Sequence, residues 1–438
     1  MHVFKNMHSI QPLSSSHLYQ IESLGDDDDG EPSFKSDSFQ EDKLVYFHPR
    51  GLKNFALVDE METLNPILDC KVLNLGNEET PQFYTLCGRG DKSSIKVLRH
   101  GLEVSEMAVS ELPAGATATW TVKGNVSDEY DKYIVVSFAN ATIVLAVGET
   151  VEEIQDSGFI GTVPSIHVGQ LGLDSFIQIH QKGIRYIKSN KKIIEWKAPQ
   201  NKPVKLAACN GKQVVLALGS SELVYFELDE TGLLSEHQER KTLSSEIVSL
   251  SIGKIQEGRQ RSRYLAVGST DATVRMFSLD PQDCLQPLSM QALSSKPTSL
   301  LLTEMSNFAS DGHLASLYLV IGLENGVLVK LTVDGITGML SDARTRFLGP
   351  KPIKLFAVNV EGSIAVLALS TRPWLQYVYQ NRSYLTPMFY ESLEYASSFA
   401  SEPCPNGIVA VTGNSLRYTA IFPLLSSQML ILWIILES

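Results

Sequence analysis

Paired apolar runs repeat along most of this 438-residue chain with a nearly constant spacing. Each pair joins two runs of apolar and β-branched residues across a short polar turn, which is the pattern of a β-hairpin. The first runs of eight such pairs end near Gly88, Ala139, Gln181, Gly219, Gly268, Gly322, Ser370 and Gly413. These ends lie 38 to 54 residues apart, with a mean near 46. Four strands fit into each repeat, so the sequence predicts an all-β chain built as a β-propeller.

One repeat shows all four of the expected strands. Ile247–Ile252 leads into the hairpin that Tyr264–Gly268 forms with Thr273–Leu279, and Cys284–Leu293 leads out of it. A β-sandwich has turn signals every 8–12 residues or so but no longer period, so it does not account for the repeat. The sequence therefore favours a propeller over a sandwich.

The charge balance limits the classes of partner. Lys and Arg together number 37 and Asp and Glu number 49, so the net charge is −12. Proteins whose main function is to bind nucleic-acid phosphates present a cationic surface. The composition argues against that function.

No sequence pattern indicates catalysis, a cofactor or a metal. The five cysteines are scattered without a CxxC spacing, which argues against a zinc site or a disulfide framework and fits a reducing compartment. The nine histidines show no HxH or HExxH spacing, and neither a G-x-S-x-G elbow nor a P-loop occurs. A propeller can also assemble an active site from several blades, which the sequence leaves open. We predict a non-catalytic protein without metal or cofactor.

The two ends carry weak targeting signals. The N-terminus has no apolar core of the kind found in secretory signals. Met429–Leu436 is a run of apolar residues, but it is much shorter than the ~20 residues of a membrane span, so we expect no membrane partner. Residues 1–45 are polar, with an acidic run at Asp26–Asp29, and we expect an irregular solvated loop. That run does not fit a calcium loop, because Gly25 and Ser36 would fall at ligand positions.

Several long segments resemble one protein family. They are Cys87–Pro113, Val135–Ile160, Gly258–Leu293, Leu340–Phe356 and Ser392–Val411. These segments closely resemble the splicing factor 3B subunit 3 family, a triple-propeller family. It is related to damage-specific DNA-binding protein 1 and to the large subunit of the cleavage and polyadenylation specificity factor. The resemblance extends from about His17 to about Arg417, and the repeats lack the Gly-His and Trp-Asp signature of WD40 blades.

The resemblance implies a domain organisation. Family members are roughly three times longer, so the chain looks like a middle piece with an internal start. Residues 1–66 would be an acidic, polar linker and a remnant of the first propeller, and residues 67–100 an orphan partial blade of that propeller. Residues 101–421 would form the second, seven-bladed propeller, followed by an aberrant apolar tail at 422–438 that resembles nothing in the family.

The resemblance also implies a function. It points to a non-catalytic scaffold subunit of the splicing factor 3B complex, which acts in pre-mRNA splicing in the nucleus. Its partners would be the other subunits of that complex, chiefly the helical-repeat subunit, with only indirect or weak contact to RNA and no small-molecule substrate. Two alternatives stay open. One is an adaptor propeller of a cullin-type ubiquitin ligase, and the other is a direct nucleic-acid-binding subunit.

Five arginines are the candidate site residues. Arg259, Arg261 and Arg263 fall in the loop before a predicted strand, and Arg344 and Arg346 fall on a leading-out strand. One interpretation is a docking patch for an acidic partner or for RNA. The other, which we favour, is that these arginines bridge neighbouring blades or lie in solvated loops. The nearby Tyr264, Phe277 and Phe347 are predicted at strand-core positions, so they are not free to stack on bases.

The chain also has to close its ring. By resemblance the hairpin at Gln82–Arg99 belongs to the preceding propeller, which leaves seven hairpins for the second one. The last of these seven needs an outer strand. Glu103–Leu112 alternates polar and apolar residues, so we predict that it pairs with Ser415–Ile421 and closes a seven-bladed ring. Residues 67–99 are predicted as three strands with open edges and an exposed apolar face.

Overall fold

The computed structural model describes residues 2–6, 55–60, 64–74, 81–98 and 101–421, except 149, 257, 307–315, 361, 380 and 381. The described residues form strands and turns with a single 3₁₀ turn at Gly90–Lys92 and no α-helix. No helix among them is long and apolar enough to cross a membrane. The chain divides into two units, His100–Leu424 and Met1–Arg99 with Leu425–Ser438. The predicted acidic loop at Asp26–Asp29 and the tail at 422–438 lie outside the described residues.

The larger unit is built from four-stranded antiparallel sheets, which we number in chain order. Sheet 1 contains β7 (Ala116–Lys123), β8 (Asp131–Phe138), β9 (Thr142–Val147) and β10 (Val151–Glu153). Sheet 2 contains β11 (Ser165–Leu171), β12 (Ser175–His180), β13 (Gly183–Ile187) and β14 (Ile193–Lys197). Sheet 3 contains β15 (Val204–Cys209), β16 (Gln213–Leu218), β17 (Glu222–Leu228) and β18 (Leu234–Glu236), with the short β19 (Lys241–Thr242) also paired to β17.

The following sheets repeat this order. Sheet 4 contains β20 (Ile247–Ile252), β21 (Tyr264–Ser269), β22 (Thr273–Ser278) and β23 (Pro287–Ala292). Sheet 5 contains β24 (Pro297–Met305), β25 (Ser316–Leu323), β26 (Val327–Val333) and β27 (Leu340–Phe347). Sheet 6 contains β28 (Lys354–Val360), β29 (Ser363–Leu369), β30 (Pro373–Tyr379) and β31 (Arg382–Phe389). The last group, sheet 7, contains β32 (Tyr395–Ser401), β33 (Cys404–Thr412), β34 (Ser415–Ile421) and β6 (Leu102–Glu111).

The predicted partner of the last hairpin is present. β6 pairs antiparallel with β34, with Glu111 opposite Ser415 and Val104 opposite Ile421. The start of β6 also makes a two-residue parallel pairing with β31, which joins sheets 6 and 7 into one eight-stranded sheet. Gly101 allows this approach, because its φ is +137° and an added Cβ would lie 2.8 Å from the carbonyl oxygen of Pro387.

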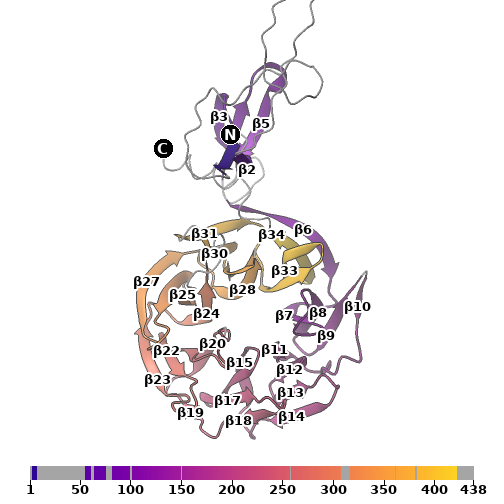
Figure 1. The fold of residues 1–438 in the computed structure, drawn as a ribbon, viewed down its shortest axis with the longest axis vertical. Helices are drawn as coiled ribbons and strands as arrows, with labels where there is room; N and C mark the ends of the chain where they lie inside the picture. The colour runs from indigo at the N-terminus through magenta and orange to yellow at the C-terminus, as the bar shows by residue number, and fades with distance from the viewer. Residues whose placement is uncertain are drawn as a thin grey trace, which may run out of the picture. The chain divides into compact units, whose positions relative to one another are not determined.

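The sheets are arranged around a common centre, with the first strands of sheets 1 to 6 nearest to it (Figure 1). Each first strand contacts the next one in the order β7, β11, β15, β20, β24, β28 and β32, and β32 contacts β7. The apolar core lies between neighbouring sheets. One cluster joins Tyr225 of sheet 3 to Phe277 of sheet 4, and both side chains are fully buried. Burial between sheets explains why the middle strands are continuous apolar runs, because both of their faces are covered.

All eight predicted hairpins are present as antiparallel pairs. Two details of the prediction are wrong. The strand that leads out of sheet 4 begins at Pro287 and not at Cys284. Cys284 and Leu285 lie in the turn between β22 and β23 and are buried in the core between sheets 3 and 4. Phe347 is not a core residue, because it lies on the outermost strand of sheet 5 and 65% of it is exposed.

The smaller unit contains two small sheets. β3 (Ile67–Leu73), β4 (Gln82–Cys87) and β5 (Ser94–Leu98) form a three-stranded sheet, as predicted, and its apolar side chains are exposed, with Ile95 at 70%. β1 (His2–Asn6) pairs with β2 (Phe55–Glu60). The prediction of an irregular loop is therefore wrong at His2–Asn6. Its partner strand lies some fifty residues away, so no local turn signal marks the pair.

Candidate protein-docking surface

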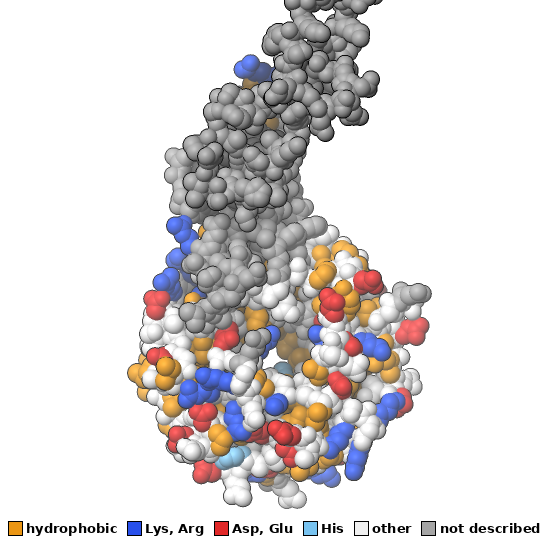
Figure 2. All heavy atoms as spheres, in the orientation of Figure 1, with side chains coloured by type: hydrophobic (Ala, Val, Ile, Leu, Met, Phe, Trp, Pro, Cys, Tyr) orange, Lys and Arg blue, Asp and Glu red, His pale blue; other side chains and the backbone are white. Residues whose placement is uncertain are grey.

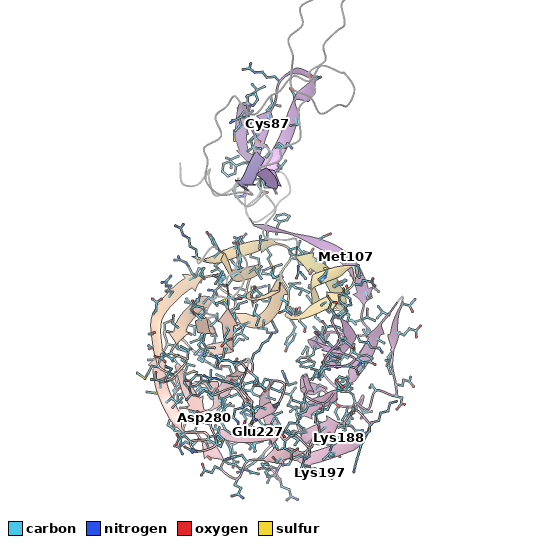
Figure 3. The ribbon with its side chains drawn as sticks, viewed as in Figure 1. Cys87, Met107, Lys188, Lys197, Glu227 and Asp280 are labelled. Carbon is cyan, nitrogen blue, oxygen red and sulfur yellow. The ribbon has the colours of Figure 1, made fainter. Side chains whose placement is uncertain are left out.

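Arg259, Arg261 and Arg263 lie on the loop between β20 and β21, which we call the arginine loop. Arg261 makes an ion pair of 3.1 Å with Glu227 on β17, which bridges sheets 3 and 4. Arg263 makes an ion pair of 3.1 Å with Asp280. Figure 3 labels Glu227 on β17 of sheet 3 and Asp280, which follows β22 of sheet 4. Arg259 is exposed and makes no ion pair with any residue that the structure describes.

A buried glutamine anchors the arginine loop. The Oε1 atom of Gln213 accepts a hydrogen bond of 2.6 Å from the backbone N–H of Ser262. Its Nε2 atom donates to the carbonyl oxygen of Ser262 at 3.0 Å and to the hydroxyl of Tyr225 at 2.8 Å. Gln213 is fully buried, so these bonds are shielded from water. The loop is therefore held at a fixed position, and the arginines project from a rigid base.

The arginine loop contacts the turn between β26 and β27. The Nη1 atom of Arg263 donates to the carbonyl oxygen of Gly335 at 3.4 Å. The Oδ1 atom of Asp334 closes the turn by accepting from the backbone N–H groups of Ile336 at 2.8 Å and Thr337 at 3.1 Å. These backbone hydrogen bonds hold the pKa of Asp334 below its usual value. The turn is thus a pre-formed structure that presents its tip.

Three exposed apolar side chains lie in or beside this turn. Ile336 and Met339 belong to the turn and are 80% and 55% exposed, and Leu288 on β23 is 37% exposed. Met290 is opposite Arg275 and so lies on the other face of β23 from Ser289. Two contacts bring the turn and β23 together. The Ser289 hydroxyl donates to the carbonyl oxygen of Gly338 at 2.8 Å, and a Cβ at Gly338 would lie 2.8 Å from Leu288. Hydrophobic side chains near β23 lie next to Lys and Arg side chains on the face in Figure 2.

We call this set the hairpin surface: Leu288, Ile336 and Met339, with Arg263 at its rim. The sequence reading found the arginines but missed the apolar residues. A signal for the apolar residues was present in the sequence. Ile336 and Met339 fall in a turn that contains Gly335 and Gly338, and residues in such turns are usually polar.

The remaining two candidate arginines lie elsewhere. Arg344 and Arg346 are exposed on β27, and Arg344 makes an ion pair of 3.1 Å with Asp342. Arg344 stands opposite Lys330, whose ammonium donates to Ser383 of sheet 6. No hydrogen bond or ion pair among the described residues joins these two arginines to the arginine loop. The five arginines therefore occupy two separate places.

Lys330 itself is a buried cation between sheets 5 and 6. Its Nζ atom donates to the Ser383 hydroxyl at 3.2 Å and lies 3.6 Å from the ring centroid of Tyr318. Burial and the neighbouring Arg344 lower the pKa of Lys330 to about 8, against the opposing effect of Asp342. No carboxylate among the described residues pairs with its ammonium.

We expect the stability of the protein to rise with pH at this site. The pKa of Lys330 is near its ordinary 10.5 in the unfolded chain and about 8 in the folded protein. Burying the charged ammonium therefore lowers the unfolding free energy below pH 8, and this loss disappears as the pH rises toward 10.5. Relative to Lys330→Met, the wild type should gain about 1 kcal/mol between pH 7 and 9.5, after allowance for solvent screening. Urea unfolding at both pH values measures this gain. Parallel pH profiles for the two proteins would contradict it, and the exposed Lys351→Met is the matched control.

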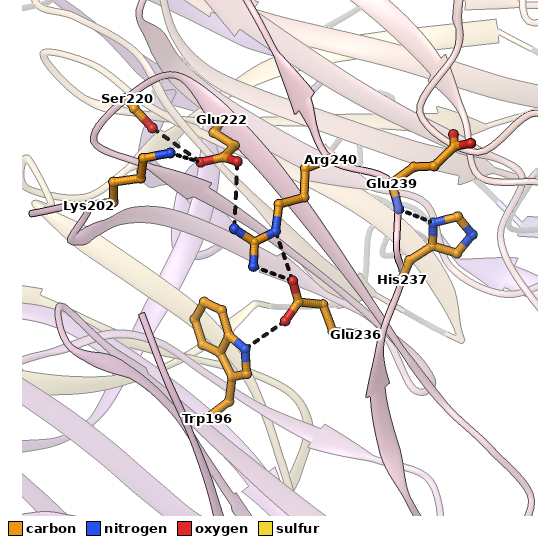
Figure 4. A network of polar contacts seen from close by, with 8 residues as sticks. All are labelled: Trp196, Lys202, Ser220, Glu222, Glu236, His237, Glu239 and Arg240. Atoms are coloured by element: carbon orange, nitrogen blue, oxygen red, sulfur yellow. Dashed lines mark hydrogen bonds and ion pairs between the residues drawn. The ribbon is translucent and has the colours of Figure 1, made fainter. Parts of the chain in front are cut away.

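Other charged residues are occupied by partners within the fold (Figure 4). The indole N–H of Trp196 on β14 donates to Glu236 on β18 at 2.8 Å, and Glu236 pairs with Arg240 at 2.5 Å. Arg240 also lies 3.6 Å from Glu222, which pairs with Lys202 at 2.7 Å. The hydrogen bond from Lys202 is the main reason that the pKa of Glu222 is lowered. This network ties sheet 2 to sheet 3, so its charges are not free for a partner.

A separate cavity of about 430 Å³ lies at the starts of β15, β20 and β24. It is lined by Lys205, Leu206, Ile247, Val248, Lys296, Pro297 and Thr298. Lys205 is neutralised by an ion pair of 2.5 Å with Glu246, and both side chains are about half exposed. The lining includes two lysines and Thr298 but no carboxylate, histidine or cysteine, so no nucleophile is paired with a base within it.

A histidine on β11 and a cysteine on β15 lie close enough to resemble a catalytic pair, but their pKa values are not those of an activated thiol. The Nε2 atom of His167 lies 3.0 Å from the Sγ atom of Cys209. Burial lowers the pKa of His167 to about 4 and raises the pKa of Cys209 to about 12, so both groups are neutral at pH 7. An activated cysteine needs the opposite shifts. Among the described residues no group of three or more His, Cys, Asp and Glu side chains could hold a metal ion.

We expect Cys209 to resist alkylation in the native protein. At pH 8 iodoacetamide should modify the exposed Cys70 first, while Cys209 reacts only after urea is added, because its thiolate is not formed in the fold. Mass spectrometry of tryptic peptides over time measures both rates. Modification of Cys209 as fast as Cys70 in native protein would show an activated thiol and reopen the question of catalysis.

Comparison with known proteins decides the family. The family model described as "RSE1/DDB1/CPSF1 second beta-propeller" matches residues 104–421. The chain belongs to the RSE1/DDB1/CPSF1 propeller family. The matched segment continues to residue 421, so the family pattern extends slightly beyond the end near Arg417 that the sequence suggested.

Curated relatives agree with this membership. Splicing factor 3B subunit 3 of Danio rerio is 54% identical over 416 residues, and the protein of that name in Drosophila melanogaster is 52% identical over 425 residues. Spliceosome-associated protein 130 A of Arabidopsis thaliana is 50% identical over 415 residues. Each alignment covers 93% of this chain. The chain spans about a third of the length of these relatives, 34% to 35%.

Proposed function

We propose that this protein is a non-catalytic propeller scaffold that acts in pre-mRNA splicing through protein contacts. The observation that carries the proposal is the identity of 50% to 54% with splicing proteins over 93% of the chain. The neutral Cys209–His167 pair and the anchored surface between sheets 4 and 5 support binding over chemistry.

We infer that the larger unit is a closed ring of seven blades. Seven groups of four strands follow one another, and the contacts of the first strands return from β32 to β7. The pairing of β6 with β34 gives the last group its outer strand from the beginning of the unit. With β6 in place, β34 is paired on both sides and is not an open sheet edge, which supports a stable ring.

We infer that β3, β4 and β5 are part of a blade from a preceding propeller. The family model that matches residues 104–421 describes a second propeller, which supports a first one before it. The exposed apolar side chains of this sheet fit a blade that packs against neighbours of its own kind. Residues 1–66 and 422–438 would then lie outside complete blades.

The proposed partners are other subunits of the splicing factor 3B complex in the nucleus, chiefly its helical-repeat subunit. The arginine loop and the arginines of β27 are candidate contacts for such a subunit. The net charge of −12 favours indirect or weak contact with RNA. A gel shift with single-stranded RNA at physiological salt should therefore show no complex, and a shift that weakens steeply with salt would favour direct RNA binding.

Affinity purification of the full tagged chain from nuclear extract tests the proposal. We expect splicing factor 3B subunits among the co-purified proteins. Cullin peptides without splicing subunits would overturn the proposal in favour of a ubiquitin-ligase adaptor. The matched control is a chain that lacks β6, which should lose its partners together with its fold.

A further inference from the structure

We infer that the boundary between sheets 5 and 6 binds one phosphate group, of the kind that a phosphorylated serine or threonine of a partner protein carries. We call the site the cationic rim, and its residues are Lys330 on β26, Arg344 and Arg346 on β27, and Ser383 on β31. The inference goes beyond the proposed function, because it concerns the chemistry of one site and is tested without a splicing subunit.

The strand register places three cations on one face of sheet 5. Lys330 is opposite Arg344, and Leu328, two residues earlier on β26, is opposite Arg346. Residues that are two apart on a strand, or directly opposite each other on paired strands, share a face of the sheet. Leu328 is buried in one core cluster with Val366 of sheet 6. The face that carries the three cations is therefore the one turned toward sheet 6.

Sheet 6 adds a hydroxyl group to this face. The Ser383 hydroxyl accepts a hydrogen bond of 3.2 Å from the Nζ atom of Lys330, so its own proton stays available for donation to a ligand. Leu385, two residues later on β31, packs in the same core cluster, which confirms that Ser383 faces sheet 5. β27 and β31 are the last strands of their sheets (Figure 1). Ser383 and Arg344 are exposed, so a ligand reaches them from solvent.

Lys330 lacks a counter-charge within the described part of the chain. The residue is 9% exposed, and the neighbours of its ammonium are the Ser383 hydroxyl and the ring of Tyr318, whose centroid lies 3.6 Å away. Burying a cation without a carboxylate costs free energy of folding. Burial, followed by the repulsion from Arg344, is also why the pKa of Lys330 is lowered to about 8. A bound anion would remove both causes, because it supplies negative charge between the two cations.

The charge of the cationic rim matches that of a phosphate group. Arg344 makes an ion pair of 3.1 Å with Asp342, but the two side chains are 71% and 57% exposed, so water weakens the pair. Arg346 is exposed and makes no ion pair with any described residue. Three cations and one carboxylate leave a net charge of about +2, and a phosphorylated side chain carries about −2 at pH 7. Guanidinium groups also bind phosphate oxygens through two parallel hydrogen bonds.

The arrangement favours a phosphorylated side chain over RNA. Single-stranded RNA binds along a cationic groove in which aromatic rings stack on its bases. The three cations here belong to two neighbouring cross-strand pairs, and the ring of Tyr318 is occupied by the ammonium of Lys330. Phe347 is exposed, but it follows Arg346 directly on β27 and so lies on the other face. The cationic rim therefore suits one phosphate and offers no ring to a base.

Thermal unfolding of the full chain in phosphate tests the inference. The midpoint is measured at pH 7 in about 20 mM phosphate and in chloride of equal ionic strength. We expect phosphate to raise the midpoint of the wild type by about 2 °C more than the midpoints of Lys330→Met and Arg344→Gln. The matched controls are Lys351→Met and Arg382→Gln, which should respond like the wild type. Arg382 is exposed and precedes Ser383 directly, so it lies on the other face of β31.

Phosphate stabilises many proteins without a specific site, and this general effect is common to all five proteins. An equal rise in all of them would therefore mean that no site is present and would overturn the inference. A rise that is lost in Arg382→Gln but kept in Arg344→Gln would also overturn it, because the site would then lie on the other face of sheet 6.

A binding measurement identifies the carrier of the phosphate. The probes are a fluorescent peptide of glycine and alanine around one phosphoserine, its unphosphorylated form, and a fluorescent RNA of about eight nucleotides. We expect the full chain to bind the phosphopeptide about tenfold or more tightly than the other two, and Lys330→Met to lose this preference. Equal binding of both peptides would overturn the inference, and so would tighter binding of RNA that Lys330→Met abolishes. Either result leaves the proposed function to its own test by affinity purification.

Discussion

A chain that starts at Gly101 should be soluble and monomeric, whereas a chain that starts at Leu112 should lose more than about 3 kcal/mol of unfolding free energy and aggregate. The second chain lacks β6, whose backbone pairs with β34 from Ser415 to Ile421. Its removal breaks this ladder of hydrogen bonds and leaves β34 as an open edge. The first chain keeps that pairing and loses residues 1–100, which include the exposed sheet β3–β5.

Size-exclusion chromatography and urea unfolding compare these two chains with the full one. The chain from Gly101 should also give a higher soluble yield than the full chain, because side chains such as Ile95 no longer favour aggregation. Equal yields for the full chain and the chain from Gly101 would show that the exposed sheet is harmless. Equal stability for the chains from Gly101 and Leu112 would refute the role of β6.

Phe277→Ala should lower the unfolding free energy by about 3–5 kcal/mol, whereas Phe347→Ala should change it by less than about 0.5 kcal/mol. Phe277 is fully buried in the core between sheets 3 and 4, with Leu265 and Leu285 in the same cluster. Truncation there removes apolar contact and leaves a cavity that rigid neighbouring sheets cannot fill. Phe347 sits on the outermost strand of sheet 5 and is 65% exposed.

The two variants delete the same atoms from adjacent sheets, so each is the control for the other. The midpoint of urea unfolding, followed by tryptophan fluorescence, measures the difference. A small effect at Phe277 would mean that the core between these sheets is loosely packed. A large effect at Phe347 would mean that a contact covers it in solution.

The sequence predicts the strands and their local pairing well, because both depend on signals a few residues apart. The hairpin of Thr142–Val147 and the one of Ser415–Ile421 are found with the observed bounds, since apolar runs and turn residues mark them directly. The pairing of β6 with β34 spans some three hundred residues. It is predictable because a ring has a single seam and the alternation at residues 103–112 fits a half-exposed strand.

Features that depend on neighbouring sheets escape the sequence. An apolar residue such as Phe347 reads as core, because strand alternation does not show that the strand is the outermost one. Cys284 is expected in a strand, but it lies in the turn between β22 and β23, where it is buried against sheet 3. The pairing of Arg261 with Glu227 and the close approach of Gly338 to Leu288 also join different sheets, and residue spacing carries no signal for such contacts.

Hydrogen exchange at β34 (Ser415–Ile421) and β6 (Leu102–Glu111) is the most direct test of the proposed closed ring, because that ring depends on the seam between the two strands. The full chain is exposed to deuterated buffer and the exchange of β34 is compared with that of β33 (Cys404–Thr412). A closed ring predicts that both strands exchange about a thousandfold or more slowly than an unstructured peptide. Exchange at the unstructured rate of β6 and of the β34 amides that do not bond to β33, with β33 still protected, would contradict it.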